Sequence, residues 1–152
     1  MQNIKIFAKN ILIPVIIGGI VGFLTSGANN YSTLIKPPFS PPAILFPIVW
    51  TILYTLMGIS YGILENKGEN DKKTNLIYFL QLFVNYAWSF IYFTFELRLF
   101  AFIWIILLGI LVTIMIYEFY KKDKTAGLLQ IPYLIWIIFA SYLNYSTYLL
   151  NR

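Results

Sequence analysis

Inside the long apolar runs of this sequence, the side chains that could do chemistry are indoles and carboxamides. They include Trp50, Trp88, Trp136, Gln81, Asn85 and Asn144. A carboxamide in apolar surroundings must find a hydrogen-bond partner, and an indole offers a flat apolar wall with one N–H donor. This combination is typical of a pocket for a planar, mostly apolar ligand. The alternative, in which the amides only bond one another across a packed core, stays open.

The residue inventory excludes much other chemistry. The chain has no histidine and no cysteine, which rules out disulfides, thiolate nucleophiles, histidine-based catalysis and the usual zinc and iron sites. Its acidic residues all lie at the ends of the apolar runs or between them, which argues against paired-carboxylate catalysis and ion-coupled pumping. We therefore expect a binding protein with no metal site and no required cofactor.

Five apolar runs must position these side chains. They cover about residues 4–26, 43–64, 76–95, 99–119 and 128–150, and each approaches the roughly 20 residues that a helix needs to cross the hydrocarbon of a bilayer. The chain is 59% hydrophobic and only 11% charged. We predict a single all-α integral membrane domain over residues 1–152, a bundle of five transmembrane helices whose partner is the lipid bilayer. The one long connection, residues 27–42, is expected to act as a lid.

The distribution of lysine and arginine predicts the orientation of this multi-pass protein. The amino-terminal side collects Lys5, Lys9, Lys67, Lys72, Lys73, Lys121, Lys122 and Lys124, whereas the other side has Lys36, Arg98 and Arg152. This excess places the amino terminus in the cytoplasm, and the loop 27–42 and the carboxyl terminus outside. Because the basic residues flank the spans and do not share one soluble face, we expect no nucleic-acid partner.

One polar and aromatic stripe is predicted on each of three helices by the helical spacing i, i+4, i+8. The stripes consist of Phe46, Trp50 and Tyr54; of Gln81, Asn85 and Ser89 with Trp88 beside them; and of Pro132, Trp136, Ala140 and Asn144. A rise of about 1.5 Å per residue places Trp50, Trp88 and Asn144 roughly 10 Å below the outer ends of their helices. We expect the stripes to face one another.

Glycine and proline patterns concern packing. Gly18 with Gly22, and Gly58 with Gly62, have GxxxG spacing, which permits close helix approach either within the bundle or in a homodimer. Pro14, Pro47 and Pro132 are expected to bend their helices. Ser40 is expected to cap the second helix, with Pro41 and Pro42 in its first turn.

Three ordered motifs resemble one known family. KPPFSPPAILFPIVWTILYTLMGISYG from residue 36, QLFVNYAWSFIYF at 81–93 and PYLIWIIFASYLN at 132–144 are similar to the signatures of the TspO/MBR family, the tryptophan-rich sensory or translocator proteins also called peripheral-type benzodiazepine receptors. The resemblance implies a five-helix bundle, commonly a homodimer, whose first loop covers a cavity open to the outside. It also implies binding of porphyrins such as protoporphyrin IX, and in various members of haem, sterols and benzodiazepine-type ligands.

The resemblance also implies roles for individual residues. They are Trp50 and Trp136 as pocket tryptophans, Tyr31 as lid tyrosine, Pro42 as the end of the loop motif, Gln81 and Asn85 as third-helix polar positions, and Ala140 as the small residue against which ligand packs. Phe39 stands where many members have tryptophan. Leu143, Tyr148 and Arg152 have the spacing of a proposed sterol motif.

These observations lead to one main hypothesis and three alternatives. The main one is a tetrapyrrole-binding sensor or carrier of a bacterial cell membrane, with the ligand against Trp50, Trp88 and Trp136 and its propionates directed towards Lys36. The enzyme alternative, implied by some bacterial members of the family, is light-dependent oxidative breakdown of protoporphyrin, which would rest on Trp50 and Trp136. Passive porphyrin transport and a partner-regulating scaffold are the other two.

Overall fold

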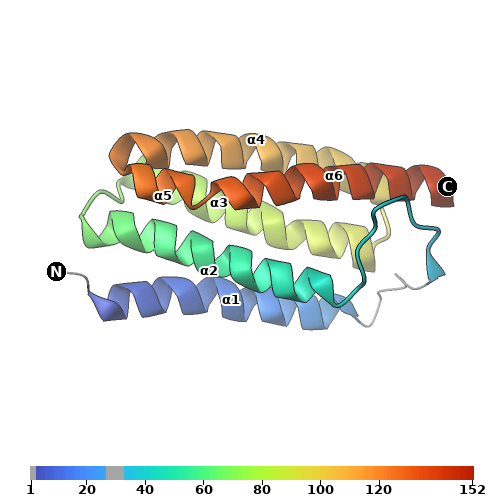
Figure 1. Ribbon diagram of the computed structural model, residues 1–152, viewed down its shortest axis with the longest axis horizontal. Coiled ribbons are helices and arrows are strands. Elements are labelled where there is room, and N and C mark those ends of the chain that lie inside the picture. The colour runs from blue at the N-terminus through green and yellow to red at the C-terminus, as the bar shows by residue number, and fades with distance from the viewer. Residues whose placement is uncertain (1–2, 27–32) are drawn as a thin grey trace.

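Five long helices lie side by side and form one elongated bundle (Figure 1). In the computed structural model, which describes residues 3–26 and 33–152, the elements are α1 (Ile4–Ser26), α2 (Leu45–Asn66), α3 (Lys72–Ser89), the π-helical turn η2 (Phe90–Thr94), α4 (Arg98–Lys122), α5 (Lys124–Leu128) and α6 (Ile131–Asn151). No strand occurs among these described residues. Five segments are long and apolar enough to cross a membrane, which confirms the predicted five-helix membrane bundle.

The two ends of the bundle differ in chemistry. The end near the first residues of α1 carries most of the charges, and we call it the charged end. The opposite end carries the lid segment, residues 33–44, and the last residues of α6, and we call it the lid end (Figure 1). Large apolar side chains cover the outer surface of the helices between these ends, as expected for a surface in contact with lipid.

Glycines set the close contact between α1 and α2. A Cβ added to Gly58 would lie 2.6 Å from the carbonyl carbon of Asn10, and one added to Gly62 would lie 2.9 Å from the Phe7 ring. This GxxxG pair is therefore used within the chain, where it lets the two helices touch. A Cβ on Gly22, in contrast, would meet no atom of residues 3–26 or 33–152 within 4 Å.

Ion pairs join the helices at the charged end. They are Lys9–Glu65, Lys67–Asp123 and Lys122–Asp71, each with an N···O distance of 2.7 Å, and Lys73–Glu118 at 3.1 Å. Each of these pairs links two different helices or their connections. The hydrogen bond from Lys67 holds the pKa of Asp123 below its usual value, and the same bond raises the pKa of Lys67. The hydrogen bond from Lys122 likewise lowers the pKa of Asp71.

The prediction that Pro47 and Pro132 bend their helices is wrong. Pro47 lies in the first turn of α2 and Pro132 in the first turn of α6, where a missing backbone N–H leaves no intrahelical bond unmade. The predicted fifth span is interrupted instead, since α5 ends at Leu128 and α6 begins at Ile131. Only Pro14 lies in the interior of a described helix.

The predicted cap of the second helix is also wrong. The Ser40 hydroxyl donates to the Pro37 carbonyl at 2.7 Å, and Ile44 occupies the N-cap position without a side-chain bond. The N–H of Leu45 donates to the Pro42 carbonyl at 3.0 Å. A backbone turn therefore starts this helix, and Pro41 and Pro42 precede it.

Candidate ligand-binding cavity

A cavity of about 570 Å³ lies in the half of the bundle nearest the lid end. Its walls come from α1, α2, the α3–η2 segment and α6, and Ser40 and Ala43 of the lid segment also line it. Ligand pockets typically measure about 300–1,000 Å³, so this cavity has the size of a small-molecule site. The predicted residues that line it are Phe46, Trp50, Tyr54, Trp88, Ser89, Trp136, Ala140 and Asn144.

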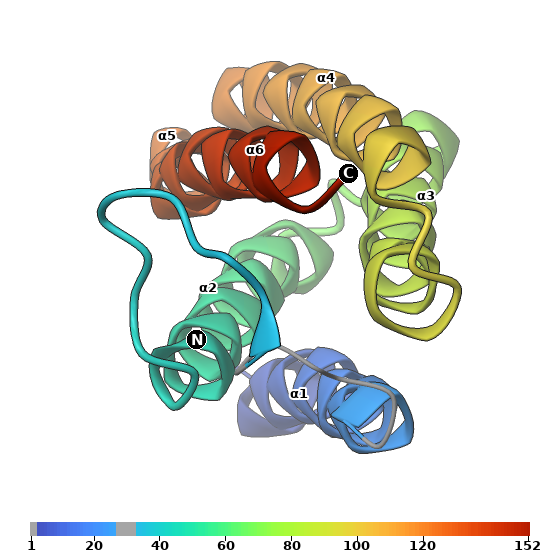
Figure 2. The same cartoon turned by 90° about the vertical axis from the view of Figure 1, so that its right-hand side faces the viewer.

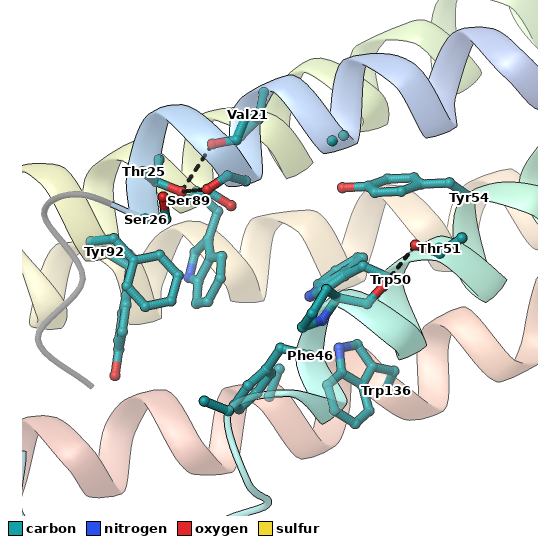
Figure 3. A pocket seen from close by; sticks show the side chains of 18 of the residues that line it. Val21, Thr25, Ser26, Phe46, Trp50, Thr51, Tyr54, Ser89, Tyr92 and Trp136 are labelled. Atoms are coloured by element: carbon teal, nitrogen blue, oxygen red, sulfur yellow. Dashed lines mark hydrogen bonds between the residues drawn. The ribbon is translucent and has the colours of Figure 1, made fainter. Parts of the chain in front are cut away.

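Aromatic rings of α2 and α6 form one wall of the cavity (Figure 3). Trp50 stacks on Tyr54 of the next helical turn, with ring centroids 5.5 Å apart. Trp136 meets Trp50 edge to face at 6.5 Å and 90°, and its other side meets Phe46 at 6.0 Å. The i, i+4 spacing of Phe46, Trp50 and Tyr54 puts all three rings on one face of α2. The result is a broad apolar surface built from rigid side chains.

The opposite wall is held by Trp88 and Asn144. The Trp88 indole N–H donates to the Asn144 Oδ1 at 2.9 Å, and the Asn144 Nδ2 donates to the Arg98 carbonyl at 2.9 Å. Because Asn144 already bonds both partners, it positions the Trp88 ring against the cavity. Trp88 also stacks on Tyr92 with centroids 5.1 Å apart.

Gln81 and Asn85 do not line the cavity. The Tyr54 hydroxyl donates to the Asn85 Oδ1 at 2.6 Å, the Asn85 Nδ2 donates to the Tyr133 hydroxyl at 2.7 Å, and that hydroxyl donates to the Gln81 Oε1 at 2.7 Å. All four side chains are buried. Both amides therefore lie behind Tyr54, in a hydrogen-bond network that supports the cavity floor.

The proline at the end of the loop motif also remains outside the lining. Pro42 does not contribute to it, although its neighbour Ala43 does. Tyr31 lies outside the described residues.

One wall was missed by the sequence prediction. Gly18, Gly19, Gly22, Thr25 and Ser26 of α1 line the cavity. Their spacing of three or four residues marks a small-residue face of that helix. GxxxG spacing predicts close packing, yet an added Cβ on Gly19 or Gly22 would meet no atom of the described residues within 4 Å. This face of α1 therefore leaves open space beside the cavity.

The π-helical turn contributes two further residues that the sequence prediction missed. The N–H of Phe95 donates to the Phe90 carbonyl at 2.9 Å, five residues earlier, which widens this turn. Tyr92 and Phe93 both line the cavity. Such turns occur frequently at functional sites.

The hydrogen-bonding groups of the lining are mostly engaged within the protein. The hydroxyls of Thr25, Ser40 and Thr51 donate to the carbonyls of Val21, Pro37 and Pro47. The Trp136 indole N–H is buried and has no partner among the described residues. Because few polar groups of the lining remain available, the cavity suits a flat, mostly apolar molecule.

The lid segment is tied to α6. The Asn151 side chain pairs with the backbone of Ile35 in both directions, accepting from its N–H at 2.9 Å and donating to its carbonyl at 2.8 Å. The Tyr142 hydroxyl donates to the Pro38 carbonyl at 2.9 Å. Seen from the lid end, this segment reaches across to α6 and returns to the start of α2 (Figure 2).

One known protein family matches most of the chain. The sequence model of the TspO/MBR family matches residues 10–149, a range that contains every described residue lining the cavity. The chain belongs to the TspO/MBR family. It is 40% identical to the tryptophan-rich protein TspO of Archaeoglobus fulgidus, over 99% of both chains.

Two other TspO/MBR relatives carry different names. The chain is 32% identical to the tryptophan-rich sensory protein of Cereibacter sphaeroides, over 86% of this chain and 82% of the relative. It is also 32% identical to the translocator protein of Ovis aries, over 83% and 77% of the two chains. Sensory and translocator names thus occur in one family of membrane proteins.

The three residues with the spacing of a proposed sterol motif line two different pockets. Leu143 lines the cavity. Tyr148 and Arg152 line a separate, shallower pocket of about 330 Å³ at the lid end. The spacing alone therefore does not place the three residues in one pocket.

Proposed function

We propose that this protein binds a tetrapyrrole of the protoporphyrin type and acts as a membrane sensor or carrier of it. The observation that carries the proposal is the cavity of about 570 Å³ walled by Trp50, Trp88 and Trp136. Rigid indoles suit a flat conjugated ring, since offset or edge-to-face aromatic contacts each contribute about 0.5–1.5 kcal/mol beyond burial. The propionates of the ligand would face the lid end, towards Lys36.

The proposal is tested by titrating protoporphyrin IX into the purified protein and following its absorbance. Replacing both wall indoles, Trp50→Ala with Trp136→Ala, should weaken binding at least tenfold, or about 1.4 kcal/mol, because two stacking surfaces are lost. Trp104→Phe is the matched control. Its indole N–H donates to the Val84 carbonyl at 2.8 Å, away from the cavity lining. An unchanged affinity in the double variant would mean that the ligand binds elsewhere.

Light-dependent oxidation of bound protoporphyrin is a second candidate function. It is favoured by the contact between Trp50 and Trp136, whose rings meet at 6.5 Å in the same wall. Bleaching of the porphyrin under light should then need oxygen and should slow in Trp50→Phe or Trp136→Phe. Equal bleaching with and without protein would exclude this activity.

Transport and scaffold functions are separated by two further measurements. Flux of protoporphyrin across proteoliposomes that exceeds flux across protein-free vesicles would indicate a carrier. Absence of any porphyrin binding would favour a scaffold. A benzodiazepine-type ligand should compete with protoporphyrin, because both would occupy the same cavity.

We also propose a homodimer in a bacterial cell membrane, with the charged end in the cytoplasm and the lid end outside. The excess of lysine at the charged end supports this orientation. Labelling of single cysteines at Lys5 and Leu149 from either side of intact cells tests the orientation. Cross-linking in membranes tests the dimer.

A further inference from the structure

Buried polar atoms of Gln130, Tyr78 and Thr74, below the cavity floor, have no hydrogen-bond partner among the described residues. Gln130 is 0% exposed, and both its Nε2 and its Oε1 are among these atoms. The Tyr78 side chain is 2% exposed, and its hydroxyl is also unpartnered. Polar groups buried in a protein are almost always paired, either with protein or with ordered water. In the interior of a membrane protein the penalty for leaving them unpaired is especially large.

The helical register puts these two side chains in one layer. Helices α3 and α6 both run from the charged end towards the lid end (Figure 1), and the Tyr133 to Gln81 hydrogen bond joins them at 2.7 Å. Gln130 precedes Tyr133 by three residues, and Tyr78 precedes Gln81 by three. Residues three apart share a helix face. Gln130 and Tyr78 therefore both lie about one turn closer to the charged end than this bond, in one layer of the bundle.

Aromatic rings pack against Tyr78. The Tyr78 ring stacks on Tyr61, with centroids 4.4 Å apart, and lies 6.1 Å from the Phe119 ring. These rings fix the position of the Tyr78 hydroxyl but cannot replace a hydrogen-bonding atom. Gln130 lies in the interruption between α5 and α6, where the backbone departs from a close-packed helix.

The layer also lies between two polar regions. Towards the lid end is the network of Gln81, Tyr133, Asn85 and Tyr54. Towards the charged end is Thr74, one turn before Tyr78, whose N–H donates to the Asp71 carboxylate at 2.9 Å. Along α3, residues 71, 74, 78, 81 and 85 thus form a polar stripe with alternating spacings of three and four.

We propose that Gln130 and Tyr78 bind internal water, at a hydration site distinct from the ligand cavity. A buried water molecule typically makes about three hydrogen bonds to groups that are otherwise unsatisfied, and the two amide atoms and one hydroxyl provide that number. The site lies on the polar stripe of α3, between the network of Tyr54 at the cavity floor and Asp71 at the charged end.

The direct test is nuclear magnetic resonance of the ligand-free protein in lipid nanodiscs, with nitrogen-15 in the glutamine side chains. Cross-relaxation between water and the Gln130 side-chain NH₂ is expected. The Gln81 NH₂ is the matched control, because its Nε2 already contacts the Met57 sulfur at 3.8 Å. If the Gln130 NH₂ shows cross-relaxation with the Tyr78 ring and none with water, the amide and the hydroxyl bond each other directly and the proposal is overturned.

A ligand arm separates this site from the cavity. Saturation with protoporphyrin IX should leave the water signal of the Gln130 NH₂ unchanged. Loss of that signal on saturation would mean that the water at Gln130 belongs to the cavity and would overturn the separate site. If protoporphyrin fails to bind, the proposed function fails, whereas the ligand-free measurement at Gln130 still decides the hydration site.

Variants test whether the two side chains share the water. Gln130→Leu and Tyr78→Phe should each lower the Tm, because each leaves the other group and the water with fewer partners. The decrease in Tm of the double variant should be smaller than the sum of the two single decreases. Strictly additive losses would show two independent groups and refute a shared site.

Discussion

The substitution Asn151→Ala should release the lid segment from α6. It removes two hydrogen bonds to the Ile35 backbone, at 2.9 and 2.8 Å. Each such bond contributes about 0.5–1.5 kcal/mol net, and both lie at the surface, so we expect a loss of about 1–2 kcal/mol for the closed lid. One or two kcal/mol corresponds to a change of roughly 5–30-fold in an equilibrium ratio. The open population should rise by that factor.

Distances between spin labels provide the assay. The chain has no native cysteine, so cysteines placed at the exposed residues Phe39 and Leu149 carry the only labels. In Asn151→Ala a longer distance should gain population and protoporphyrin should dissociate faster. Asn151→Asp is the graded control, because its carboxylate still accepts from the Ile35 N–H but no longer donates to the carbonyl. Identical distance distributions in wild type and Asn151→Ala would refute the assignment of Asn151 as the tie of the lid.

The other predictions concern the cavity and the charged end. Gly22→Leu should fill the cavity and weaken protoporphyrin binding with little change in Tm, since an added Cβ meets no atom of the described residues within 4 Å. Gly58→Ala should instead lower the Tm, because its Cβ would lie 2.6 Å from the backbone of α1. If both variants weaken binding equally, the assignment of Gly22 to the cavity and of Gly58 to helix packing is wrong. The pKa of Asp123 is lowered in the folded protein by its bond with Lys67, so its stabilising contribution is present above the unfolded value, near 3.9, and is lost as the pH falls through the lower folded value. Thermal melts should therefore show a drop in Tm below about pH 4 that is smaller in Lys67→Met, and an undiminished drop would assign the acid sensitivity to other carboxylates.

Much of the fold could be predicted from the sequence, because lipid imposes a simple rule on chain length and composition. The predicted spans 4–26 and 99–119 correspond to α1 (Ile4–Ser26) and α4 (Arg98–Lys122). The interruption before α6 could not be located by hydropathy, since it falls inside the apolar run that starts at Leu128, where Gln130 is flanked by Leu129 and Ile131. Pro132 was the available signal, and it was interpreted as a bend because a proline inside an apolar run does not reveal whether the helix continues through it.

The candidate site was predictable where one helix face carries aromatic residues, as with Trp50 and Trp136. It was not predictable where the outcome depends on a partner from another helix. Asn85 shares a face with residues of the cavity wall, yet the hydroxyls of Tyr54 and Tyr133 engage it. Periodicity gives the direction of a side chain, but it does not show whether a cavity or a bonding partner lies there.

The π-helical turn η2 makes the length of its segment as important as its composition. Each residue of an α-helix advances the chain by about 100° around the axis, and a π-turn accommodates one residue more than an α-turn. Deleting one residue from Phe90–Thr94 would therefore restore a regular helix and rotate the following residues away from their present neighbours. Tyr92 and Phe93 line the cavity, and together they would lose that position, whereas replacing either by another apolar residue would leave the register intact. Insertions and deletions in this segment should accordingly alter ligand preference more than substitutions do.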